Sequence, residues 1–379
     1  MHVTIAHSLD IDSADAIAEV LAACEAEWQE RTPRAGLLIA SIEHDFAVLQ
    51  GAILERWPSL ELIGCSGDGE LSSVVGVADD SVALMLFGSD RIRFRSGVGT
   101  DVSVDPARAA RQALAGATEG EAGTPSLCVI LPEGWAIDVQ AVLRAFQEEL
   151  GPQTLVVGGM ASETTHAGPT RQACKGQTLQ DAVPCLLFYG DLKFSNAVGS
   201  GMKPVGKKHR VTRASGPWVQ TIDDRPAAEL WTEYFGMHSL FYPLAVFPED
   251  DGEFYLSATP KADADGSALF FSPIPEGSTV RFADVTQDEL IAAAAVVCER
   301  AVGSYPGTRP VAGLVFSCAG RKAMLGTRVG EEIALLRSKL DARIPFIGFY
   351  TNGELCPLKG QTTTRDHGYT FVTVLIGEE

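Results

Sequence analysis

Two glutamates occupy the same place in a repeated pattern. Residues 63–71 and 347–355 both read I-G-x-x-x-[DN]-G-E-L, so Glu70 and Glu354 each follow a glycine-rich turn. Arg321 lies in a third loop, shortly after another apolar run. A glutamate can receive an ammonium group, and an arginine can hold a carboxylate through two parallel hydrogen bonds. Together these side chains would suit a zwitterion such as an amino acid.

The same pattern also has a purely structural interpretation. Glycine permits positive φ angles and a close approach of two backbones. A glutamate beside such a turn can bond nearby backbone amides and contact no ligand. The sequence leaves both interpretations open for Glu70, Glu354 and Arg321.

Three similar units of strand and helix are expected to position these residues. A weaker third copy of the pattern occurs at 157–163, and an apolar run, an amphipathic helix and a second apolar run precede each copy. Short apolar runs that alternate with helices are typical of βαβ units with parallel strands. The expected units are 36–40, 46–56 and 60–64, then 127–131, 139–150 and 155–158, and finally 311–316, 325–340 and 345–348.

In a right-handed βαβ unit, the loops after both strands open on the carboxyl edge of the sheet, where ligands of open α/β sheets usually bind. We therefore expect the loops of the three units to form one ligand site. The predicted ligand-contacting residues are Cys65, Ser66, Gly69, Glu70, Trp135, Gly159, Ser317, Cys318, Arg321, Tyr350, Asn352, Gly353 and Glu354.

The spacing of the glycines predicts an insertion. Gly64 and Gly158 lie 158 − 64 = 94 residues apart, whereas Gly158 and Gly348 lie 348 − 158 = 190 apart. The extra segment, 205–275, is rich in β-type runs and Asp/Gly turns. The expected fold is α/β, with repeated βαβ units forming mixed sheets flanked by helices and a mainly β insertion before the C-terminal unit.

Four motifs in register resemble the FIST family, and the resemblance covers nearly the whole chain. Residues 63–70 are similar to its G-C-S-x-x-G-E signature, and Gly158-Gly159 resembles its mid-domain G-G. Residues 223–235 resemble the start of its C-terminal domain, and 348–357 resemble its closing G-x-x-x-x-G-E-x-x-P. The resemblance implies an N-terminal domain at 1–222 and a C-terminal domain at 223–379.

The resemblance implies a bacterial sensory module that binds a small ligand, with amino acids or their derivatives proposed. Such modules act through a signalling partner such as a histidine kinase or a cyclic-dinucleotide enzyme. Members that sense nitric oxide carry haem, so a haem-based sensor is the alternative, and His44, His166 or His238 would then be its ligand. One departure is that the run 253–258 has no arginine, where many members have one.

Enzyme chemistry is the third alternative. Ser66 lies in a near match to a nucleophile elbow, but Asp68 stands where glycine is needed and no helix is expected to follow. Residues 201–208 nearly spell a phosphate-binding loop, but Lys208 stands where the Ser/Thr should be. We therefore expect a binding protein that is not an enzyme and has no metal.

Composition narrows the classes of partner. The chain of 379 residues has 30 Lys+Arg and 49 Asp+Glu, a net charge of −19, which disfavours nucleic acid and anionic membranes. No apolar run reaches the roughly 18 residues of a membrane span, and none of the 8 cysteines forms a C-x-x-C pair. We expect a cytoplasmic protein whose basic cluster, 207–210, contacts an acidic surface of its signalling partner.

Overall fold

The chain builds one order of elements three times. The computed structural model describes residues 1–379 except 30, 136, 164–167, 238–240, 249–253 and 260. The first repeat consists of β1 (His2–Ser8), α1 (Ser13–Glu27), β2 (Ala35–Ala40), α2 (Phe46–Arg56), β3 (Glu61–Ser66), β4 (Glu70–Ser72), β5 (Gly76–Ala78) and β6 (Val82–Gly88). The second consists of β7 (Arg93–Thr100), α3 (Pro106–Thr118), β8 (Leu127–Ile130), α4 (Val139–Leu150), β9 (Leu155–Gly159), β10 (Gln172–Cys174), β11 (Gln177–Leu179) and β12 (Ala182–Tyr189).

The third repeat carries an insertion after its first strand. Its own elements are β13 (Lys193–Gly199), α6 (Gln287–Ser304), β22 (Ala312–Cys318), α7 (Ala319–Leu325), a 3-10 turn (Gly326–Arg328), α8 (Val329–Lys339), β23 (Phe346–Thr351), β24 (Glu354–Pro357), β25 (Thr364–His367) and β26 (Phe371–Gly377). The insertion, which we call the β-module (residues 203–284), contains β14 (Lys203–Ser215), β15 (Trp218–Ile222), β16 (Arg225–Pro226), α5 (Glu229–Phe235), β17 (Leu244–Phe247), β18 (Tyr255–Ser257), β19 (Lys261–Ala262), β20 (Ala268–Leu269) and β21 (Thr279–Asp284). The rest of the chain is the body.

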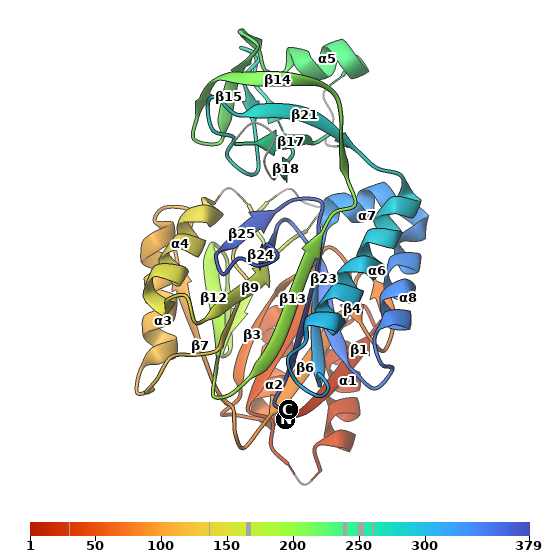
Figure 1. Cartoon of the computed structure of the whole chain (residues 1–379). Coiled ribbons are helices and arrows are strands. Elements are labelled where there is room, and N and C mark those ends of the chain that lie inside the picture. Colours follow the sequence, from red (N-terminus) through yellow and green to blue (C-terminus); the bar gives the residue numbers. More distant parts are fainter. Residues whose placement is uncertain (30, 136, 164–167, 238–240, 249–253, 260) are drawn as a thin grey trace.

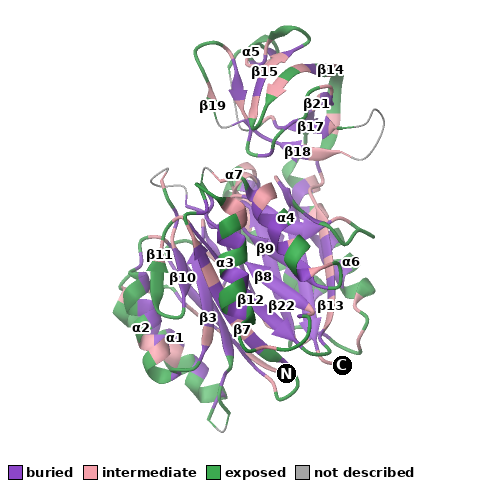
Figure 2. Cartoon of the chain, turned by 90° about the vertical axis from the view of Figure 1, so that its left-hand side faces the viewer, coloured by how far each residue is buried: buried purple, intermediate pink, exposed green. Residues whose placement is uncertain are grey.

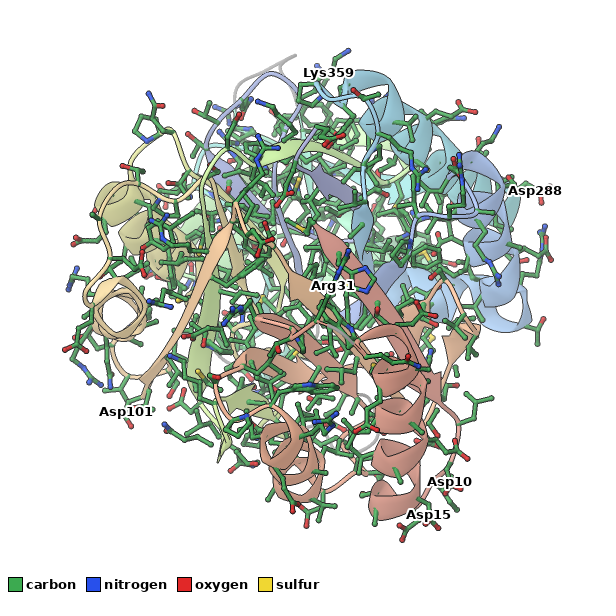
Figure 3. All side chains as sticks on the ribbon, turned by 90° about the horizontal axis from the view of Figure 1, so that it is seen from below. Asp10, Asp15, Arg31, Asp101, Asp288 and Lys359 are labelled. Carbon is green, nitrogen blue, oxygen red and sulfur yellow. The ribbon has the colours of Figure 1, made fainter. Side chains whose placement is uncertain are left out.

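Each repeat forms a mixed sheet, and its hairpin pairs with the sheet of the preceding repeat, the third repeat counting as the one before the first. In the first repeat β2 and β3 are parallel, and β6 and β1 continue the sheet in antiparallel fashion. Hairpin β4–β5 pairs with β23, β10–β11 pairs with β3, and β24–β25 pairs with β9. The exchange closes three sheets into a ring, and Figure 3 shows the three groups of helices around it.

The register places the glycines of the repeated pattern at equivalent points, which confirms the repeat prediction. Gly64 lies opposite Leu38, and Gly348 lies opposite Val315, on parallel strand pairs. Gly158 lies opposite Ile130 in the second repeat. A Cβ at Gly348 would lie 1.8 Å from the carbonyl oxygen of Val315, so a side chain there would force the two strands apart. The pattern requires glycine because two backbones touch.

The core lies between the sheets, and the helices cover their outer faces. Figure 2 shows the strands of the body as buried and the outward faces of the helices as exposed. Side chains such as Phe87, Phe188 and Phe349 are fully enclosed. The first helix of each repeat has an N-cap residue whose side chain accepts from the first turn, at Asp12, Asp105 and Thr286. No helix among the described residues is long and apolar enough to cross a membrane.

The β-module stands apart at one end of the body (Figure 1). It replaces the short loop that joins the first strand and first helix in the other two repeats, and the chain enters it after β13 and leaves it before α6. Its β-rich character confirms the expected insertion. Because β13 pairs with β26, residues 193–199 belong to the same sheet as the C-terminal repeat. The expected division at 222/223 falls within the β-module, which spans residues 203–284.

Candidate functional site

The loops at the strand ends of the three repeats meet, as the repeat prediction requires. The amide of Ser162 donates to the Ser66 carbonyl at 3.0 Å, and the amide of Asp68 donates to the Tyr350 carbonyl at 3.1 Å and to Ser162 Oγ at 2.9 Å. These bonds tie the repeats together. The predicted ligand-contacting residues that are buried here are Cys65, Ser66, Gly69, Glu70, Gly159, Ser317, Cys318, Arg321, Tyr350, Gly353 and Glu354.

Glu70 and Glu354 bond to groups of their own repeats. Glu354 Oε2 accepts from the amide and hydroxyl of Thr370 at 3.1 and 2.6 Å, and Glu70 Oε2 accepts from Ser81 in the same way at 3.3 and 2.6 Å. Gln172 holds the equivalent register position in the second repeat and accepts from the amide of Ala182 at 3.3 Å. These bonds agree with the structural interpretation of the pattern, in which the glutamate beside the turn bonds nearby backbone amides. Ligand contact by either glutamate stays a prediction.

Burial should keep both carboxyls protonated near neutral pH. Desolvation raises the pKa of Glu70 and of Glu354 to about 8, against the opposing effect of the hydroxyl donors. A carboxyl whose pKa is raised by folding stabilises the protein fully below its unfolded pKa, near 4.5. That stabilisation is lost as the pH rises toward 8.

We expect Glu354→Gln to be stabilising at high pH, because glutamine cannot ionise and Gln172 shows that the position accepts it. The free energy of unfolding should exceed that of the wild type by at least about 1 kcal/mol at pH 8 and differ little at pH 5. Urea denaturation at both pH values measures this difference. An equal loss of stability at pH 5 and pH 8 would show that Glu354 is ionised in the folded protein.

Arg321 is enclosed between the body and the chain connections to the β-module. Its side chain is fully buried and pairs with Glu332. Its Nη1 donates to the Ser200 carbonyl at 2.7 Å, and its Nη2 donates to the Leu290 carbonyl at 2.9 Å. Ser200 lies just before the β-module and Leu290 lies in the first turn of α6, just after it. Arg321 therefore holds both connections, and its predicted contact with a ligand carboxylate stays a prediction.

The remaining predicted residues lie in different surroundings. Trp135 is 43% exposed, and Asn352 donates through Nδ2 to the Gly134 carbonyl at 3.3 Å. Burial raises the pKa of the Cys65 and Cys318 thiols. Tyr350 donates through its hydroxyl to Glu332 Oε2 at 3.1 Å. These contacts are internal to the body, apart from the exposed face of Trp135.

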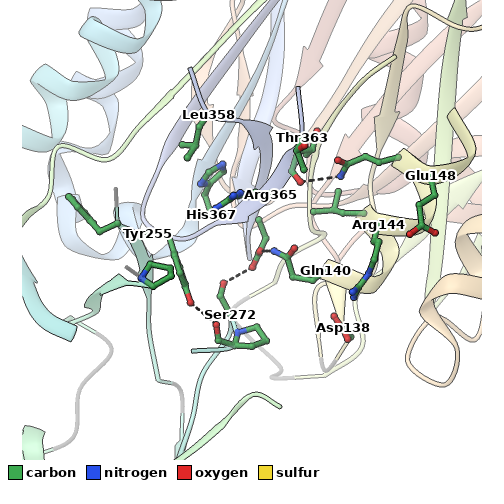
Figure 4. A pocket seen from close by; sticks show the side chains of 17 residues that line it. Asp138, Gln140, Arg144, Glu148, Tyr255, Ser272, Leu358, Thr363, Arg365 and His367 are labelled. Atoms are coloured by element: carbon green, nitrogen blue, oxygen red, sulfur yellow. Dashed lines mark hydrogen bonds between the residues drawn. The ribbon is translucent and has the colours of Figure 1, made fainter. Parts of the chain in front are cut away.

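A cleft of about 770 Å³ lies between the body and the β-module. Figure 4 shows α4 on one side of it, the β24–β25 hairpin beside α4, and the β-module opposite. Lining residues from the body include Asp138, Gln140, Arg144, Gln147, Glu148, Thr363, Arg365, Asp366 and His367, and those from the β-module include Pro248, Phe254, Tyr255, Ser272 and Pro273.

A buried hydrogen-bonded group connects the two walls of the cleft. Ser272 of the β-module donates through Oγ to Asp366 Oδ2, and Gln140 of α4 donates to Asp366 Oδ1. Burial raises the pKa of Asp366 and lowers that of His367 to about 4. The Tyr255 hydroxyl donates to the Pro273 carbonyl at 2.7 Å. Asp366 thus bridges the β-module and the body.

Besides Asp366, basic and acidic side chains of the body line the cleft. Arg144 and Arg365 are exposed, and neither forms an ion pair with a residue that the structure describes. Asp138 and Glu148 bring negative charge to the α4 side. The cleft can therefore hold an anionic group, and an ammonium group beside it.

None of the residues predicted to contact a ligand lines this cleft. The predicted residues follow the strands of the repeats. The cleft is lined instead by α4, by the segment that contains β25, and by the β-module. The tract 361–367 offered a signal, because it carries three threonines, Arg365, Asp366 and His367 between the repeated pattern and the last apolar run of the chain. Such polar tracts in loops often have a binding role.

Of the three histidines predicted as haem ligands, the structure describes only His44. His44 is 5% exposed, and its Nδ1 lies 3.2 Å from Ser13 Oγ, away from the cleft. His367 lines the cleft, but its Nε2 lies 2.8 Å from the Cys356 carbonyl. His166 and His238 lie outside the described residues. Within the described ranges no cluster of three or more His, Cys, Asp or Glu side chains suits a metal ion. Haem stays a prediction.

Two family models together match most of the chain. Residues 34–225 match the FIST N domain and residues 227–357 match the FIST C domain. Two Mycobacterium tuberculosis proteins, the uncharacterized proteins MT0656 (strain CDC 1551 / Oshkosh) and Rv0628c (strain ATCC 25618 / H37Rv), are each 27% identical over 395 residues, with 98% of both chains covered.

Solved structures give weaker similarity. Cyanuric acid hydrolase from A. caulinodans is 9% identical, with a TM-score of 0.33 over 99% of this chain and 98% of that one. T. maritima PurL complexed with ATP is 10% identical, with a TM-score of 0.24 over 76% of this chain and 72% of that one. These scores are too low to support an inference about fold or function.

Proposed function

Because this chain belongs to the FIST family, whose domains are sensory domains of signal transduction, we propose that it senses a small ligand bound in the cleft between the β-module and the body. The observation that carries the proposal is that both parts line the cleft. A ligand that contacts both walls favours the relative orientation that fits it best. The function is binding and signalling in the bacterial cytoplasm, without catalysis.

The connections between the two parts suit such a shift. The chain passes between them at 199–203 and 284–287, and Arg321 bonds next to both passages through Ser200 and Leu290. Within the described residues, Asp366 joins the walls of the cleft through Ser272 and Gln140. A ligand that displaces this bridge would change the orientation of the β-module while leaving the three-sheet body intact.

A distance measurement tests this proposal. All eight native cysteines are buried, so Ser215→Cys in the β-module and Glu119→Cys in the body would provide two exposed sites for spin labels. We expect the distance distribution to change when the small molecules released by heating freshly purified protein are added back. The control adds the same fraction to protein with both labels on the body, at Glu119→Cys and Glu55→Cys.

Three results would count against this proposal. A distance between the parts that stays the same with a fraction shown to bind would contradict signalling through the β-module. A change within the body pair would locate the motion elsewhere. A co-purified haem, visible as strong absorption by the protein itself, would instead favour the gas sensor.

The output surface is proposed to include the basic cluster 207–210 on β14. Lys207 and Lys208 are exposed, whereas His209 Nδ1 lies 2.7 Å from Asp223 Oδ2. The cluster therefore combines two exposed lysines with a histidine whose ring is hydrogen-bonded to Asp223. An acidic surface of a histidine kinase or a cyclic-dinucleotide enzyme would complement it.

We expect Lys207→Glu/Lys208→Glu to reduce recovery of such a partner severalfold in a pull-down at low salt, because it reverses two exposed charges. The difference should shrink in 1 M salt, where charges are screened within about 3 Å. The matched control is Arg31→Glu/Lys359→Glu, which reverses two exposed charges on the body (Figure 3). Equal recovery of both double variants would remove the cluster from the interface.

A further inference from the structure

We infer that the ligand of the cleft is an aromatic acid, a molecule with a planar ring and a carboxylate or similar anionic group. This inference rests on the proposed function and names the class of ligand. It follows from the two unlike walls of the cleft, one of ring side chains and one of polar side chains, and from the size of the space between them.

The β-module supplies the wall of rings. Phe254, Tyr255, Pro248 and Pro273 all line the cleft from this side. The Tyr255 hydroxyl donates to the Pro273 carbonyl at 2.7 Å, and the Phe254 ring lies 5.4 Å from that of Phe247. These contacts orient the Tyr255 and Phe254 rings within the β-module. Aromatic and proline rings favour flat apolar partners, since planar rings stack or pack edge to face.

The body supplies the polar wall, on which Arg144 and Arg365 lie beside the carboxyl side chains Asp138 and Glu148. The amides of Gln140 and Gln147 are engaged by Asp366 and by the Thr364 carbonyl. Arg144 and Arg365 have no ion-pair partner among the described residues, so their guanidinium groups can bind the anionic group of a ligand. Guanidinium groups bind carboxylates with two hydrogen bonds and also stack on ring faces.

The size of the cleft argues against a small aliphatic ligand. Its volume of about 770 Å³ lies in the upper half of the range of about 300–1,000 Å³ that is typical of pockets for larger organic ligands. An aliphatic amino acid would touch one wall and leave most of the space to water. A ring held by the β-module and an acid held by Arg365 would contact both walls, as the proposed signalling requires.

Three matched probes separate the ring from the acid. Phenylpropionate has both groups, cyclohexylpropionate replaces the planar ring with a saturated one, and phenylpropanol lacks the carboxylate. Calorimetric titration of the full chain should show phenylpropionate binding at least tenfold more tightly than either of the others.

Two variants assign the groups to the walls. Arg365→Gln should weaken phenylpropionate binding about tenfold or more and leave phenylpropanol binding unchanged, because the lost interaction involves the carboxylate. Phe254→Leu should remove the preference for phenylpropionate over cyclohexylpropionate. The control is Arg343→Gln, an exposed arginine that does not line the cleft. Thermal unfolding confirms that each variant folds.

Several results would overturn the inference. Equal affinity for phenylpropionate and cyclohexylpropionate would show that the cleft does not recognise an aromatic ring. Equal affinity for phenylpropionate and phenylpropanol would show that it does not recognise a carboxylate. Failure of all three probes to bind, or binding that both cleft variants leave unchanged, would also reject it. None of these results bears on the spin-label measurement, which uses the protein's own released molecules and so tests the proposed function separately.

Discussion

Replacing Arg321 with methionine should lower the free energy of unfolding by about 3–5 kcal/mol. The substitution removes a fully buried guanidinium and leaves Glu332 as a buried charge without its partner. It also leaves the carbonyls of Ser200 and Leu290 without their donor. Methionine fills similar space, so the loss is electrostatic more than steric. Urea denaturation at pH 7 measures it.

Two variants control for this effect. Arg328→Met removes an arginine that pairs with Asp288 and Glu331 at the surface, where such pairs contribute about 0–1 kcal/mol. Arg321→Met/Glu332→Leu removes both buried charges and should recover part of the lost stability. A loss for Arg321→Met no greater than that for Arg328→Met would contradict a stabilising role of the buried pair Arg321–Glu332.

Replacing Gly348 with alanine should destabilise the protein by about 3 kcal/mol. The new Cβ would lie 1.8 Å from the Val315 carbonyl oxygen, which belongs to the backbone of the neighbouring parallel strand. Neither strand can move easily, because β22 is also paired with β26 and β23 is also paired with β4. Chemical denaturation should show the lower free energy of unfolding. Hydrogen exchange of the backbone amides in β22 and β23 should become faster.

The other glycines provide matched comparisons. Gly64→Ala should cost less, because its Cβ would lie 2.3 Å from the Leu38 carbonyl oxygen. Gly330→Ala in α8 meets nothing within 4 Å and should stabilise the helix by about 0.5–1 kcal/mol. If Gly348→Ala proved as stable as the wild type, close approach of the strands could not explain the repeated I-G pattern.

The sequence located the important residues of the repeats but not their roles. The I-G-x-x-x-[DN]-G-E-L pattern singled out Glu70 and Glu354, and the loop position singled out Arg321. Their environments came from the tertiary structure, because a carboxyl buried against Ser81 or Thr370 and one that faces a ligand have the same local sequence. Arg321 likewise gained its partners Glu332, Ser200 and Leu290 from helix and strand ends that pack around it.

The sequence by itself determined the three repeats, the equivalent glycines and the β-rich insertion. These features depend on local periodicity and backbone sterics, which neighbouring residues set. Only the tertiary structure decided the exchange of hairpins between sheets and the cleft beside the β-module. Both bring together segments that are far apart in the chain, such as 138–148, 254–273 and 363–367. Which segments meet depends on how whole elements pack, and no local pattern records it.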